Sequence, residues 1–98
     1  MKKISEDLKE LALKIGVENT DIFQEELQEY IRNNYGLHIC IDLSYTKAPK
    51  PDRWYYIIED IQSGEDCIKK MIYSFYLYED CLEEALKQTI NYILNGKH

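Results

Sequence analysis

The residues best suited to chemistry lie on one short segment, where His38, Cys40 and Asp42 occupy alternate positions. Imidazole, thiolate and carboxylate groups are all ligands of Zn²⁺. The remaining positions of Leu37–Tyr45 are apolar or serine, and a period of two predicts a strand. Side chains on one face of a strand repeat about every 7 Å, which is too far apart for three ligands of one ion. We therefore interpret the three residues as the polar face of a sheet.

Other catalytic patterns are missing from the sequence. Cys40, Cys67 and Cys81 are widely spaced, and none follows a glycine-rich elbow of the kind that would position a nucleophile. The four glycines fall at the expected ends of helices or in a turn, which argues against a phosphate-binding loop. We expect no catalytic residues, no bound metal and no cofactor. A small hydrolase or metal enzyme is kept as an alternative.

Length and charge limit the class of protein. The chain has 98 residues, a formal net charge of −6 and three cysteines. This length fits one domain that spans residues 1–98. Nucleic-acid binding needs clustered lysine and arginine, so it is disfavoured. No run approaches the roughly 20 apolar residues of a membrane span, and the N-terminus lacks the apolar core of a signal peptide. We expect no membrane partner and a cytoplasmic location.

Six elements must position these residues. The expected elements are helices over about 5–15, 19–34 and 81–94, and strands over 37–45, 53–61 and part of 67–77. Ser5 caps the first helix, and Asp80 opens a capping box for the last. A proline-containing loop joins the first two strands. The sequence therefore predicts an α+β fold of order α-α-β-β-β-α, with a three-stranded antiparallel meander and helices packed mainly on one face.

The second predicted strand, R-W-Y-Y-I-I-E-D-I, is apolar on both faces. Leu37, Ile39, Ile41 and Leu43 of the first strand should face the helices. The opposite face is then too apolar in its middle to be simply solvated, so either the first helix or a second molecule should cover it. The candidate interaction residues on this face are His38, Cys40, Asp42, Trp54, Tyr56, Ile72 and Tyr76.

Two resemblances bear on the chain. Residues 19–95 are similar in element order to double-stranded-RNA-binding domains, but the last helix begins with the acidic run Glu79–Glu84, so only the topology would carry over. A closer likeness rests on the runs Tyr35-Gly36-Leu37-His38-Ile39, Trp54-Tyr55-Tyr56-Ile57-Ile58 and Tyr78-Glu79-Asp80-Cys81-Leu82-Glu83-Glu84-Ala85-Leu86. These runs resemble small uncharacterised proteins of Bacteroides-type bacteria and their phages. The resemblance implies a prophage or other mobile-element context and no known activity.

The favoured function is a non-enzymatic protein-interaction module. Nine tyrosines against two phenylalanines supply rings with polar tips, which suit a contact surface. The partner is another protein or a second copy of the chain, which would form a homodimer. An alternative is an acidic mimic of nucleic acid that occupies a DNA- or RNA-binding protein. That function would depend on Glu25, Glu26 and Glu29.

Overall fold

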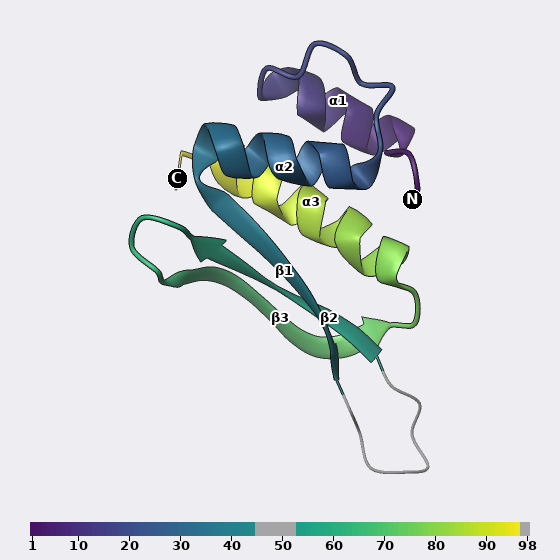
Figure 1. The fold of residues 1–98 in the computed structure, drawn as a ribbon, viewed down its shortest axis with the longest axis vertical. Coiled ribbons are helices and arrows are strands. Elements are labelled where there is room, and N and C mark those ends of the chain that lie inside the picture. Colours follow the sequence, from purple (N-terminus) through teal and green to yellow (C-terminus); the bar gives the residue numbers. More distant parts are fainter. Residues whose placement is uncertain (45–52, 97–98) are drawn as a thin grey trace.

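The computed structural model describes residues 1–44 and 53–96, and the side chains of Ser44 and of residues 69–74 lie outside this description. The elements are α1 (Glu6–Lys14), α2 (Gln24–Tyr35), β1 (Leu37–Ser44), β2 (Arg53–Asp60), β3 (Asp66–Phe75) and α3 (Tyr78–Leu94). The strands form one antiparallel sheet in the order β1-β2-β3 (Figure 1). The predicted α+β class and element order are confirmed. The predicted proline loop lies outside the described residues.

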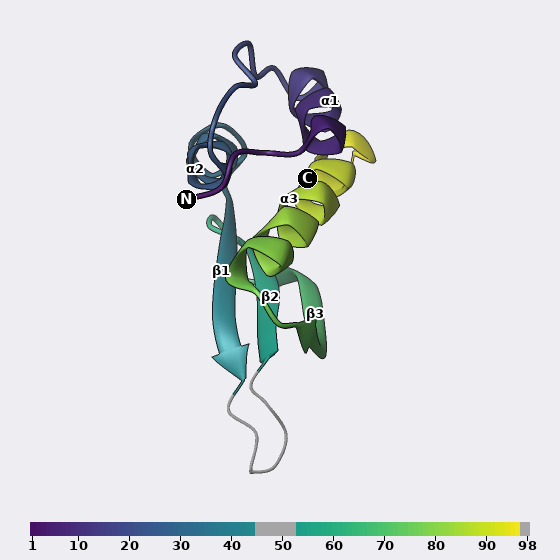
Figure 2. The same ribbon diagram turned by 90° about the vertical axis from the view of Figure 1, so that its right-hand side faces the viewer.

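α2 and α3 pack on the same side of the sheet, and α1 packs on α3. Leu37 and Ile39 of β1 and Tyr56 and Ile58 of β2 are at most 1% exposed, and they share one core with buried residues of every helix. α3 contacts all three strands, α2 contacts β1, and α1 packs against α3. Figures 1 and 2 both show α1 at the end of the molecule away from the strands. Thus α1 does not cover the opposite face of the sheet.

The second helix begins later than predicted, at Gln24 rather than near Asn19. The N-terminal segment pairs in extended form with the residues just before α2. The N–H of Ile4 donates to the carbonyl of Ile22 at 3.1 Å, and the N–H of Gln24 donates to the carbonyl of Lys2 at 2.8 Å. Extended backbone in this pairing cannot also form a helical turn. A tertiary contact therefore outweighs the local capping signal.

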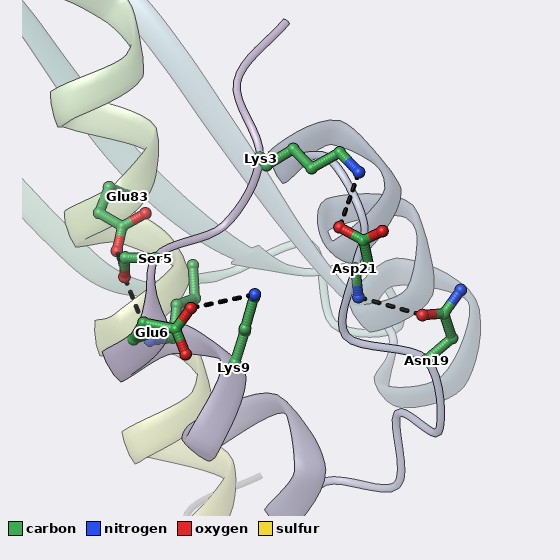
Figure 3. A network of polar contacts seen from close by, with 8 residues as sticks. Lys3, Ser5, Glu6, Lys9, Asn19, Asp21 and Glu83 are labelled. Atoms are coloured by element: carbon green, nitrogen blue, oxygen red, sulfur yellow. Dashed lines mark hydrogen bonds and ion pairs between the residues drawn. The ribbon is translucent and has the colours of Figure 1, made fainter.

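The same N-terminal segment connects α1 with α3. Ser5 is the N-cap of α1, as predicted, and its hydroxyl oxygen accepts the N–H of Leu8 at 3.2 Å. The hydroxyl also donates to the carboxylate of Glu83 on α3. Nearby, Lys3 forms an ion pair with Asp21 at 2.7 Å, which ties the N-terminus to the segment before α2 (Figure 3).

The third helix begins at Tyr78, so the capping box expected at Asp80 is wrong. The ring of Tyr78 packs edge-on against that of Trp54, with 5.3 Å between centroids. The side-chain amide of Gln24 donates to the carbonyl of Glu79 at 3.0 Å. Contacts with β2 and α2 thus fix the first turn of α3, which has no capping side chain.

Candidate functional site

The register of β1 and β2 divides the predicted interaction residues between two faces. Ile41 pairs with Tyr56, and Leu43 pairs with Trp54. Directly paired residues point to the same face of a sheet, so Tyr56 and Trp54 lie on the helical side. Tyr56 is 1% exposed, and Trp54 packs against the core. Their predicted place on the open face is therefore wrong.

The opposite face of the sheet, which we call the outer face, is built from the other rows of β1 and β2. Its cross-strand pairs are His38 with Glu59, Cys40 with Ile57, and Asp42 with Tyr55, and Arg53 and Tyr76 lie beyond them. The described residues of the outer face are His38, Cys40, Asp42, Arg53, Tyr55, Ile57, Glu59, Tyr76 and, as the β3 partner of Glu59, Asp66. Four of these belong to the predicted set. The side chain of Ile72 lies outside the description.

Five described residues of the outer face are missing from the sequence prediction: Arg53, Tyr55, Ile57 and Glu59 of β2, and Asp66 of β3. A shift of one residue in the register of β2 exchanges its two rows, and both rows are rich in apolar residues. One signal in the sequence does favour the row of β2 that lies on the outer face. It carries charged residues at both ends, Arg53 and Glu59, whereas the other row begins with Trp54 and has only Asp60 as a charged residue. Charges at both ends are typical of a row that meets solvent.

The thiol of Cys40 is held in a protonated form on the outer face. Its sulfur donates to the Oε1 atom of Glu59 at 3.4 Å. Burial, followed by this contact and by the charges of Glu59, Asp66 and Asp42, raises the pKa of Cys40 to about 11. The thiolate is the reactive form of cysteine, so this residue is a poor nucleophile near neutral pH. Among the described residues, no three histidine, cysteine or acidic side chains are placed to hold one metal ion.

Aromatic and guanidinium groups are ordered at the Arg53 end of the outer face. The Cζ atom of Arg53 lies 3.6 Å from the centroid of the Tyr76 ring, and Tyr76 is 63% exposed. The hydroxyl of Tyr55 donates to the Oδ2 atom of Asp42 at 3.4 Å. Tyrosine and arginine dominate the energetics of many protein interfaces. This end therefore presents typical interface residues that already have partners to orient them.

A depression of about 500 Å³ lies between the end of α2 and the turn after β2, away from the outer face. Its lining residues are Arg32, Asn33, Asn34, Tyr35, Gly36, Asp60 and Gln62. The one carboxylate among them, Asp60, accepts the backbone N–H of Gln62 at 2.9 Å and so shapes the turn after β2. The lining contains no histidine or cysteine, and we assign it no catalytic pair.

Several acidic residues of the helices have structural partners. Glu26 accepts the backbone N–H of Phe23 at 3.1 Å, which satisfies a donor at the start of α2. Glu83 binds the hydroxyl of Ser5 and lies 3.6 Å from the ammonium of Lys87. These contacts give Glu26 and Glu83 a structural role within the chain, so their presence does not require a partner that recognises acidic groups. They do not favour the nucleic-acid-mimic alternative.

Comparison of the chain with known protein families, curated proteins and solved structures found no match. The resemblance to small proteins of Bacteroides-type bacteria and their phages therefore stays a prediction. No helix among the described residues combines the length and apolar character needed to cross a membrane.

Proposed function

We propose that this protein is a non-enzymatic interaction module that docks another protein surface on its outer face. The carrying observation is that α2 and α3 pack on one side of the sheet and α1 packs on α3, which leaves the outer face without a described helix. At its centre lie Tyr55 and Ile57, both partly exposed. An apolar centre with charged ends is the usual arrangement of a protein interface.

The edges of the sheet favour docking on its face rather than addition of a strand. On β1, the carbonyl of Ile39 accepts the side-chain amide of Gln28 at 2.8 Å, and the N–H of Leu43 donates to Asp42 at 2.8 Å. These contacts occupy groups at the edge that β2 does not pair. On β3, pairing with β2 is irregular at two places. Backbone groups that already bond side chains, and bulges in an edge strand, both discourage the addition of another strand.

The cysteines support a cytoplasmic location as part of the proposal. All three are free, and Cys81 is fully buried. Secreted domains of this size more often form disulfide frameworks. The mobile-element context implied by the sequence resemblance is compatible with such a location.

The proposal is tested by affinity capture from extract of the source cells with three tagged forms: wild type, Ile57→Asp and Leu13→Asp. Leu13 is the control because it is 57% exposed on α1, on the helical side. Circular dichroism would first show that all three are folded. We expect the captured set, including untagged copies of this chain, to be lost with Ile57→Asp and kept with Leu13→Asp. Equal capture by both variants would overturn the proposal.

A further inference from the structure

The β2 row of the outer face carries opposite charges at its two ends. Asp66 adds a second negative charge beside Glu59, and Asp42 of β1 lies one pair in from Arg53. Glu59 lies at the end near the β2–β3 turn, and Arg53 lies at the other end of the same row of β2. Six residues of extended strand place them about 20 Å apart, so they do not pair within one copy. Between them in the row are Tyr55 and Ile57. The β2 row is therefore charged at each end and apolar or aromatic in the middle.

This pattern is complementary to itself in only one of two symmetric arrangements. Two sheets stacked face to face can be related by a two-fold axis along the strands or across them. An axis along the strands places Glu59 at the level of Glu59 of the second copy, and Arg53 at the level of Arg53. An axis across the strands places Glu59 opposite Arg53 of the second copy, and Ile57 opposite its Tyr55. Opposite charges then meet, and apolar groups meet between them.

We propose that the outer face receives a second copy of this chain, related by a two-fold axis across the strands, so that Glu59 of each copy lies opposite Arg53 of the other. This inference rests on the proposed function and names its partner. The twist of each sheet rotates the stacked strands by about 30° from exact alignment. The ion pair occurs twice in such a dimer because the interface is isologous.

The size of the face sets the expected strength. The face is three strands wide, at about 4.8 Å per strand, and eight residues long, at about 3.4 Å per residue. Its area is therefore roughly 400 Å² per copy. Interfaces that bury less than about 1,200 Å² in total form weak or transient complexes. The dimer should therefore be in equilibrium with monomer at micromolar to millimolar concentration.

Charge exchange tests the geometry directly. Sedimentation equilibrium would compare wild type with Glu59→Arg, Arg53→Glu and the double exchange, each checked by circular dichroism. Each single change places like charges opposite each other at two positions and should weaken association about ten-fold or more. The double exchange rebuilds both pairs with reversed polarity and should restore the dissociation constant to within about three-fold of wild type. A change that merely damaged the fold would not be rescued.

The outcomes separate this inference from the proposed function. Rescue by the double exchange, with loss of association in Ile57→Asp, supports both. Failure of rescue, or a wild-type chain that stays monomeric throughout the concentration range, overturns the homodimer. In either of these cases, capture from extract that depends on Ile57 and not on Leu13 still supports the proposed function.

Discussion

Replacement of Ile57 or of Ile58 by alanine should have very different effects on stability, although the two residues are neighbours in β2. Ile58 is 0% exposed on the helical side and belongs to the core shared with α3. Ile57 lies on the outer face and is partly exposed. The pair therefore tests the register of β2 with the same chemical change at adjacent positions.

The expected magnitudes follow from burial. Alanine removes three side-chain carbons from isoleucine, and each buried methylene contributes about 0.8 kcal/mol, which gives about 2.4 kcal/mol for Ile58. The cavity raises the total to about 3–4 kcal/mol. The partly exposed Ile57 should lose about 1 kcal/mol. In a chain of this length, each kcal/mol lowers the Tm by about 4–8 °C, so the two variants should differ by more than about 8 °C.

Thermal and urea unfolding, followed by fluorescence, would measure both losses. Trp54 is the only tryptophan, and its ring contacts Tyr78 on α3, so its emission reports docking of the helix on the sheet. The protein must be dilute enough to be monomeric, so that a change in association does not enter the result. Equal losses would refute the assigned register. A larger loss for Ile57 would place Trp54 and Tyr56 on the open face after all.

Three further predictions concern other parts of the fold. Ser5→Ala should lower the free energy of unfolding by about 1 kcal/mol because it removes the N-cap of α1; unchanged stability in urea would contradict the capping role. Gly16→Ala should lower the Tm more than Gly36→Ala, since φ is positive at both but an added Cβ would lie 2.9 Å from the Tyr30 hydroxyl only at Gly16; equal Tm values would contradict this. Burial raises the pKa of Cys81 from 9.0 to about 12, so the folded state keeps a proton that the unfolded state loses, and the free energy of unfolding should fall as the pH rises above 9.0. Urea titrations at several pH values should show a shallower fall in Cys81→Ala, and an identical slope would count against this cause.

Local patterns in the sequence are sufficient for the number, order and type of the elements. The ends that depend on backbone conformation are also correct: Gly36 ends α2 with φ 67°, in the left-handed region that favours glycine. Ser5 caps α1 for an equally local reason, because its side chain reaches the first-turn N–H groups of its own helix. These signals depend on residues a few positions apart.

The errors all concern contacts between distant parts of the chain. The start of α2 depends on pairing with the N-terminal segment, and the start of α3 depends on the packing of Tyr78 against Trp54. Which row of β2 faces the helices depends on whether Leu43 pairs with Trp54 or with a residue next to Trp54 in the sequence. A shift of one residue changes no local propensity, but it exchanges the buried and exposed rows. Local propensity therefore could not assign Tyr56 to the core, and only the charges of Arg53 and Glu59 at the ends of the other row favour that assignment.

The position of α1 determines which surface remains for a partner. Two helices on a three-stranded sheet leave both the back of the helices and the far face of the sheet exposed. Here α1 packs against α3 with Leu8 and Ala12 fully buried, so the chain covers part of the helical side itself. The first helix thus adds to the core, and no described helix covers the outer face. Because Glu59 and Arg53 lie at opposite ends of one strand, the proposed docking of a second copy depends on their polarity, which can be reversed without changing composition or net charge.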